Sequence, residues 1–331
     1  MKTLSRLLIA ILVFTSCTFI NAFENKIAYP QARLDNVVDN YFGTKVPDPY
    51  RWLENPDSAE TRSWIEAENK ITFGFLEKIP VREKIKERMT KLWNYERYGI
   101  PIQENGHYFL RKNSGLQNQS VLYYAETLTS EPKVLLDPNQ LSSDGTVALE
   151  DLVSSHDAKL LAYGLAASGS DWMEWKVRDV NSATDLSDHL KWIKFSSVSW
   201  TADDKGFYYS RYDEPKAGTE LEQANYYQKL YYHQIGTPQT SGKLVYQRSD
   251  QKEWGFGATV TDDGRYLIIT VSQSTSPKHL IFYQDLQDKT SKVTELIKNF
   301  EADYTFLGNE GPLFWFKTDM NTPKGKIIAI N

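Results

Sequence analysis

The sequence has little cysteine and little positive charge, and both shortages exclude classes of protein. One of the 331 residues is a cysteine, Cys17, so the chain can form no internal disulfide and no cysteine-based metal cluster. Lys and Arg number 38 against 43 Asp and Glu, a net charge of -5. A nucleic-acid-binding surface needs concentrated positive charge, so this balance argues against a nucleic-acid partner.

Motifs for hydrolytic, phosphate and metal chemistry are lacking as well. The sequence contains no G-x-S-x-G nucleophile elbow, no H-E-x-x-H zinc motif, no G-x-x-x-x-G-K phosphate loop and no EF-hand loop. The five histidines lie at no ligand-like spacing and are interpreted as structural: His107, His156, His189, His233 and His279. The sequence therefore predicts no cofactor and no metal site, and it assigns no catalytic residue.

Residues 1–22 have the pattern of an export signal, with a basic start, an apolar core at Leu7 to Phe14, and small or polar residues after it. The core is too short for a membrane span. The expected protein is exported, and is periplasmic, anchored to the envelope or secreted.

Two routes of signal processing fit this segment equally well. Phe14-Thr15-Ser16-Cys17 loosely matches a bacterial lipoprotein signal, in which Cys17 would carry a lipid anchor. Ile20-Asn21-Ala22 offers an ordinary cleavage site, and Cys17 would then only fill the apolar core.

The residues after the signal divide into two sections of different character. Residues 23–98 begin with a Pro-, Asp- and Tyr-rich segment, Tyr29 to Asn55, that predicts an extended, irregular lead-in. Two amphipathic helices are then expected, the first capped by Asp57 with Glu60 and broken at Pro80, the second at residues 81–93. Residues 99–331 consist of short β-type runs.

A repeat organises this second section. A turn containing Asp or Asn leads into an aromatic or β-branched strand five times, at intervals of roughly 50 residues. The turns begin at Asn105, Asp157, Asp204, Asp263 and Asn309. Each is followed by a further apolar strand, in turn Val121 to Ala125, Trp175 to Val180, Lys229 to Ile235, His279 to Leu286 and Lys326 to Ile330. This period predicts four-stranded propeller blades, with a β-sandwich as the weaker alternative.

The fifth unit stops at Asn331, after what would be its third strand. Because each blade must cover the apolar face of its neighbour, the expectation is a partial propeller of about four to five blades from an incomplete chain.

Two acidic pairs raise the alternative of a propeller glycosidase, Asp203-Asp204 and Asp262-Asp263. Both pairs lie in the repeated turn, where Asp commonly caps its own backbone, so a structural role is favoured.

Six runs carry a more specific signal: DPYRWLENPDS from Asp48, EAENKIT from Glu66, GLQNQSVLYY from Gly115, LDPNQLSSDGTVAL from Leu136, AYGLAASGSDW from Ala162 and QKLYYHQIGT from Gln228. In this order they resemble the N-terminal half of the prolyl oligopeptidase family of serine peptidases, over about residues 29–331. The resemblance implies a seven-bladed propeller on an α/β-hydrolase domain that cleaves short peptides after proline, with the propeller as a size gate. It also implies that the helical section packs on the hydrolase domain.

The family's Ser, Asp and His follow the propeller, in sequence that this chain does not contain, so the resemblance implies an inactive fragment. One propeller residue reaches the proline pocket in the family, an aromatic that matches Phe195 in WIKFSSVSW. Animal members have Met and Arg where this chain has Gly255 and Ser272, which removes an Arg partner for the substrate backbone.

The leading hypothesis is thus the N-terminal part of an exported serine endopeptidase, mainly β with a short helical section and lacking the hydrolase domain. Its expected partners are short proline-containing peptides, and at full length we expect a monomer. The alternative is a non-catalytic propeller module that binds a peptide or an envelope partner.

Overall fold

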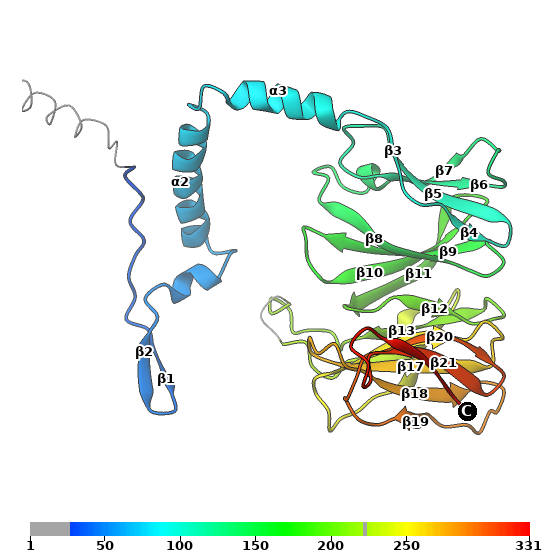
Figure 1. Ribbon diagram of the computed structural model, residues 1–331. Helices are drawn as coiled ribbons and strands as arrows, with labels where there is room; N and C mark the ends of the chain where they lie inside the picture. Colours follow the sequence, from blue (N-terminus) through cyan, green and yellow to red (C-terminus); the bar gives the residue numbers. More distant parts are fainter. Residues whose placement is uncertain (1–26, 221–223) are drawn as a thin grey trace, which may run out of the picture. The chain divides into compact units, whose positions relative to one another are not determined.

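The computed structural model describes residues 27–220 and 224–331, and the chain divides into two compact units, residues 1–92 and 93–331 (Figure 1). Cys17 and the expected signal lie outside the described residues. No helix among the described residues is long and apolar enough to cross a membrane.

The first unit contains a β-hairpin that the sequence analysis missed. Strands β1 (Val38–Tyr41) and β2 (Thr44–Pro47) pair antiparallel, so the prediction of a wholly irregular lead-in is wrong. Phe42 and Gly43 form the turn with φ of 52° and 94°, the two left-handed residues that a tight hairpin turn requires. Phenylalanine is rare at such a turn position, so the amino-acid sequence did not predict the hairpin.

The two expected helices are confirmed. A short 3₁₀ turn, η1 (Arg51–Glu54), precedes α2 (Ala59–Leu76), and α3 (Arg82–Trp93) follows it (Figure 1). The predicted cap is wrong by one position, because Ser58 is the N-cap and its hydroxyl accepts a hydrogen bond from the Thr61 N–H at 3.1 Å.

The acidic residues that suggested the cap have other partners. Asp57 pairs with Arg62, and Glu60 accepts hydrogen bonds from Arg33 at 2.7 and 3.2 Å. Their charges are therefore compensated by side chains and not by the end of the helix.

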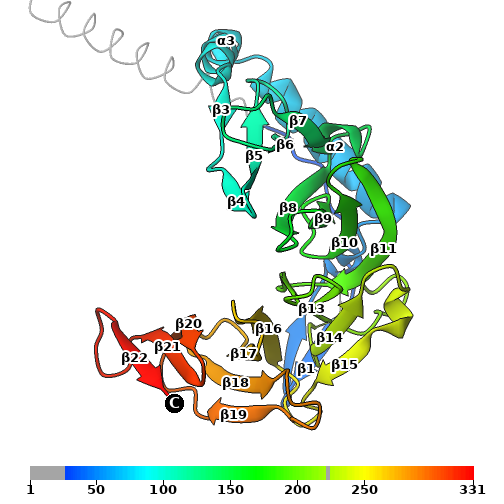
Figure 2. The same cartoon turned by 90° about the vertical axis from the view of Figure 1, so that its right-hand side faces the viewer.

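The second unit consists of five antiparallel sheets, which we call blades 1 to 5 (Figure 2). Blade 1 contains β3 (Arg97–Tyr98), β4 (Ile102–Glu104), β5 (His107–Asn113), β6 (Val121–Ala125) and β7 (Lys133–Leu136). Blade 2 contains β8 (Val147–Ser154), β9 (Leu160–Ala167), β10 (Met173–Asp179) and β11 (Thr184–Ile193). Since β3 pairs with β5, residues 97 and 98 belong to blade 1.

Blades 3 and 4 have four strands each, and blade 5 has three. Blade 3 contains β12 (Val198–Trp200), β13 (Gly206–Arg211), β14 (Lys229–Gln234) and β15 (Lys243–Tyr246). Blade 4 contains β16 (Trp254–Val260), β17 (Tyr266–Gln273), β18 (Leu280–Asp285) and β19 (Thr294–Ile297), and blade 5 contains β20 (Tyr304–Glu310), β21 (Leu313–Thr318) and β22 (Lys326–Ile330). Two further 3₁₀ turns, η2 (Pro138–Gln140) and η3 (Gln239–Ser241), lie in loops. Every predicted strand of the repeat is present, which confirms the partial propeller.

Four hydrophobic cores lie between the five blades, one at each junction. Alternate residues of one strand point to opposite faces, so each inner blade contributes to two cores. In β13, Phe207 and Tyr209 pack in the core shared with blade 2, whereas Tyr208 packs in the core shared with blade 4. This is why β9 and β17, the second strands of blades 2 and 4, are apolar at most positions.

The repeated turn has the same hydrogen bonds in blades 2, 3 and 4. Ser155, Thr201 and Thr261 each donate a side-chain hydrogen bond to the Asp two residues later, at 2.8, 2.8 and 2.6 Å. Each turn joins the first two strands of its blade, so all three turns lie at one end of the sheets. We call this the turn end, and the opposite end, where each blade's first strand begins, the entry end.

Candidate functional site

Phe195 lies at the entry end, in the loop between β11 and β12 that joins blade 2 to blade 3. Its side chain is 65% exposed, although it follows the buried Ile193 and Lys194. Phe195 and Trp192 both have a left-handed backbone, with φ of 55° and 63°.

A left-handed backbone is uncommon for bulky residues and costs roughly 1 to 3 kcal/mol at each position. Such a conformation persists only where surrounding contacts impose it, and it is frequent at ligand-binding sites. The Tyr212 N–H donates to the Trp192 carbonyl at 2.9 Å, which fixes the start of the loop. The backbone of the loop is therefore held in a conformation that leaves the aromatic ring of Phe195 exposed.

Two buried polar side chains hold the rest of this loop. Gln228 donates to the Lys194 carbonyl at 2.9 Å and accepts from the Phe256 N–H at 2.6 Å. The Ser210 N–H donates to the Ser196 hydroxyl oxygen at 2.8 Å, and the Ser210 hydroxyl donates to the Phe256 carbonyl at 2.7 Å. The Phe195 loop is thus tied to β16 of blade 4 as well as to blade 3.

Lys194, in the same loop, is buried with 7% of its surface exposed, and no carboxylate pairs with it among the described residues. Its ammonium lies 4.0 Å from the ring centre of Trp172 and donates to the Asn225 side chain at 3.1 Å. Burial lowers the pKa of Lys194, and the nearby Asp171 carboxylate opposes this effect.

Gly255 and Ser272 face each other across β16 and β17, at the same entry end as Phe195. A Cβ on residue 255 would lie 2.9 Å from the Ser272 Oγ and 3.3 Å from the Gln228 Oε1. A larger side chain at residue 255 would therefore displace Ser272 or the glutamine that holds the Phe195 loop.

The acidic pairs do not form a catalytic site. Asp203 and Asp263 each accept the N–H two residues later in their own turn, at 3.3 and 3.0 Å, as capping predicts. Asp204 instead accepts from blade 2, from the His156 N–H and side chain and from the Asp157 N–H, at 2.8 to 2.9 Å. It connects two blades, which the sequence pattern did not reveal.

Each of the five histidines has one protein partner. His107, His156, His189 and His279 bond with Tyr124, Asp204, Glu174 and Asp303 at 2.6 to 2.9 Å. His233 is fully buried and bonds with the fully buried Asp188 of blade 2 at 2.7 Å. Over residues 27–220 and 224–331, no group of three His, Cys, Asp or Glu residues could hold a metal ion.

The positioning residues Gln228, Ser210 and Lys194 were not found from the sequence. Gln228 opens one of the six family-like runs, but nothing in its local pattern indicates a buried amide that bridges two blades. Gln228 and Ser210 reach the Phe195 loop only because blades 2, 3 and 4 pack side by side in the folded chain.

Residues 29–331 match the family described as the prolyl oligopeptidase N-terminal beta-propeller domain. The chain belongs to this prolyl oligopeptidase propeller family. It is 33% identical over 324 residues to a prolyl endopeptidase of Elizabethkingia meningoseptica, covering 98% of this chain and 45% of that protein. It is 34% identical to prolyl oligopeptidase A of Amanita bisporigera, covering 92% of this chain and 44% of the relative.

Solved structures of the family agree with the fold. Prolyl oligopeptidase B of Galerina marginata, bound to a 35-residue hydrolysis and macrocyclization substrate, has a TM-score of 0.81 at 32% identity. That match covers 91% of this chain and 45% of the other. The chain thus spans about half the length of the prolyl oligopeptidases that it matches, and its described sheets are all antiparallel.

Proposed function

We propose that this chain is the propeller-bearing N-terminal part of a serine endopeptidase that hydrolyses short peptides on the carboxyl side of proline. The observation that carries the proposal is the outward, strained Phe195 in a chain of this family. An exposed aromatic face can pack against a pyrrolidine ring, and the ties from Gln228 and Ser210 orient it before the substrate binds.

The same proposal explains the first unit. The helices α2 and α3 leave large apolar side chains exposed, including Phe73 and Phe75 at 53% and 56% and Met89 at 62%. A hydrolase domain would cover them, and it would supply the nucleophile, base, carboxylate and oxyanion hole that acyl transfer requires. The 331-residue chain alone is then inactive, and its propeller gates substrate size only as part of the longer enzyme.

Hydrolysis of a chromogenic Gly-Pro peptide tests this proposal. We expect no cleavage by the purified 331-residue chain, and cleavage by the product of the longer reading frame from which it derives. Cleavage by the 331-residue chain, with contaminants excluded, would overturn the inactivity. A longer product that leaves the Gly-Pro bond intact would overturn the peptidase function.

Phe195 can be tested in the same longer product. Phe195→Ala should raise KM for the proline substrate at least about tenfold, which corresponds to about 1.4 kcal/mol. Phe42→Ala removes an exposed aromatic residue of the first unit, which is not part of the Phe195 loop, and serves as the matched control. Equal KM values for the two variants would remove Phe195 from the substrate site.

The alternative of a non-catalytic binding module makes a different prediction for the chain by itself. A module must be stable without further domains, whereas the exposed apolar helices should make this chain bind a hydrophobic dye or aggregate. A monomeric preparation that melts cooperatively and binds no dye would favour the module.

Export is part of the proposal, with Cys17 as the residue that separates the two routes. Labelling with a radioactive fatty acid in a bacterial host should be lost in Cys17→Ser if the chain is a lipoprotein. An unlabelled chain whose mature N-terminus follows Ala22 would assign the ordinary cleavage instead.

A further inference from the structure

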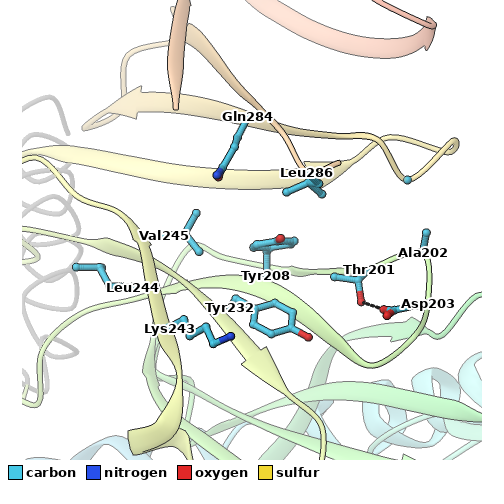
Figure 3. A pocket seen from close by; sticks show the side chains of 11 residues that line it. Thr201, Ala202, Asp203, Tyr208, Tyr232, Lys243, Leu244, Val245, Gln284 and Leu286 are labelled. Atoms are coloured by element: carbon cyan, nitrogen blue, oxygen red, sulfur yellow. Dashed lines mark hydrogen bonds between the residues drawn. The ribbon is translucent and has the colours of Figure 1, made fainter. Parts of the chain in front are cut away.

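A cleft of about 640 Å³ lies between blades 3 and 4 at the turn end, away from the Phe195 loop (Figure 3). Figure 3 shows Gln284 and Leu286 on one side, Lys243 and Tyr232 on the other, and Tyr208 and Val245 between them. The first pair comes from blade 4 and the remaining residues come from blade 3.

The neighbouring junction shows that an open cleft is not a general property of this fold. Between blades 2 and 3, Gln239 in the loop after β14 exchanges two hydrogen bonds with the Lys191 backbone, at 3.0 and 3.1 Å. Asp188 accepts from His233 and from the Gly236 N–H at 2.7 and 2.8 Å. The corresponding loop of blade 4, residues 286–293, makes no hydrogen bond to blade 3 among the described residues. Other contacts join these blades, such as the ion pair of Arg248 with Glu295 of β19 at 3.2 Å, but none that the described residues make bridges the cleft beside this loop.

Polar and apolar side chains both line the cleft, and two of them are phenols, Tyr208 and Tyr232. Tyr208 is 8% exposed, and its ring lies 5.4 Å from that of Tyr232. Gly206 leaves room for this arrangement, because a Cβ there would lie 2.6 Å from the Tyr232 hydroxyl. Neither hydroxyl has a hydrogen-bond partner among the described residues, and burial raises the pKa of Tyr208 to about 12. Tyr208 therefore stays protonated and can donate to a ligand.

The charges at the cleft favour an anion. The Asp203 carboxylate is already compensated, since it accepts from Thr201 at 2.8 Å and from the Lys205 ammonium at 3.0 Å. Lys243 is exposed, and it has no carboxylate within 4.0 Å in the described part of the chain. A ligand with an apolar body and one carboxylate would satisfy Lys243 and the phenols together.

We propose that this cleft binds the C-terminal residue of a short peptide that carries an apolar side chain. The side chain lies among Tyr208, Val245 and Leu286, and the carboxylate contacts Lys243. The site needs no hydrolytic chemistry, so it stands or falls independently of the proposed peptidase function.

Calorimetric titration of the 331-residue chain with acetyl-Gly-Gly-Leu tests the site, using the monomeric fraction isolated by size-exclusion chromatography. The free acid should bind at least about tenfold tighter than the peptide with a C-terminal amide, which corresponds to about 1.4 kcal/mol. It should also bind at least about tenfold tighter than 4-methylpentanoate, which offers the same apolar carboxylate without a peptide. No saturable binding, or equal affinity for the acid and the amide, would overturn the proposal. Equal affinity for 4-methylpentanoate and the peptide acid would show that the cleft does not recognise a peptide.

Amino-acid substitutions test whether the peptide binds in this cleft. Lys243→Met should remove the preference for the acid over the amide, whereas Lys278→Met, an exposed lysine at the entry end, should preserve it. The double variant Tyr208→Phe with Tyr232→Phe keeps both rings and should weaken binding of the acid without changing the melting temperature. Full affinity in Lys243→Met would place the ligand elsewhere and contradict the assignment.

Discussion

The two units of this chain both have apolar side chains in regular patterns, but only one of them has an interior. In residues 27–92, Thr61 alone is buried. Large apolar residues of both helices are exposed, among them Phe73 and Phe75 of α2 and Met89 of α3. In residues 93–331, four cores lie between consecutive blades, with Trp175, Leu230 and Phe316 fully buried. A periodic pattern of apolar residues in the sequence predicts a face that packs against something. Only the fold shows whether this chain supplies the packing partner.

The two units differ because their elements pack against different parts of the protein. A blade buries its faces against the next blade, about 50 residues along the chain. A helix with one apolar stripe needs a surface of another element, and most helical stability comes from such packing. Substitutions in the second unit should therefore change the free energy of unfolding far more than equivalent substitutions in the first.

The largest effect is expected for the core between blades 2 and 3. Trp175→Ala should lower the free energy of unfolding by about 3 to 5 kcal/mol, because it leaves a cavity beside Gly164, whose ideal Cβ would lie 3.0 Å from the indole. Phe73→Ala, at a side chain 53% exposed, should change it by less than about 0.5 kcal/mol. Urea denaturation measures both, and equal losses would show that α2 also belongs to a packed core.

A second large effect is expected at the buried hydrogen bond between Asp188 and His233, which joins the same blades. Asp188→Ala leaves the buried His233 ring and the Gly236 N–H without their acceptor and should cost about 3 kcal/mol. Glu174→Ala removes the same kind of partner from the exposed His189 and should cost at most about 1 kcal/mol. If the two variants unfold at the same urea concentration, burial does not determine the strength of these pairs.

The connection at the turn end should contribute less. Asp204→Ala removes three hydrogen bonds from His156 and Asp157 and should cost about 1 to 3 kcal/mol. Asp262→Ala, in the next blade's turn, removes a carboxylate with no hydrogen bond among the described residues and should be nearly neutral. Thermal melting of both variants distinguishes a link between blades from a local cap.

The smallest effect concerns pH. Hydrogen bonds lower the pKa of Asp263 in the folded protein, and the one from the Thr261 side chain has the largest effect. A lowered pKa stabilises the fold above the unfolded value near 3.9, and this contribution is lost as the pH falls through the lower folded value. Between pH 6 and pH 3, Asp263→Asn should therefore lose less stability than the original chain. Parallel curves of the free energy of unfolding against pH would contradict this.

Much of the fold was predictable because its signal is local. The recurring turn with Asp or Asn, followed each time by an aromatic or β-branched strand, predicted the blades, and the six family-like runs predicted the family. The β1–β2 hairpin escaped because its turn uses Phe42, and the α2 cap was displaced because Ser58 and Asp57 are both good caps.

The candidate site was less predictable, because its parts are distant in sequence. Phe195 was found only through the family resemblance, and its role in binding stays a prediction. Gln228 and Ser210 hold its loop from blade 3, and they act together with Phe256 of blade 4, which no local pattern encodes. The hydrogen bond between Asp188 and His233 likewise depends on how blades 2 and 3 pack against each other.

Hydrogen exchange of backbone amides, measured by mass spectrometry on the 331-residue chain, tests the contrast between the two units most directly. The account predicts slow exchange in β9, β13 and β17, whose residues pack in two cores each, and exchange near the rate of an unfolded chain in α2 and α3. Protection of α2 as strong as that of β17 would contradict it.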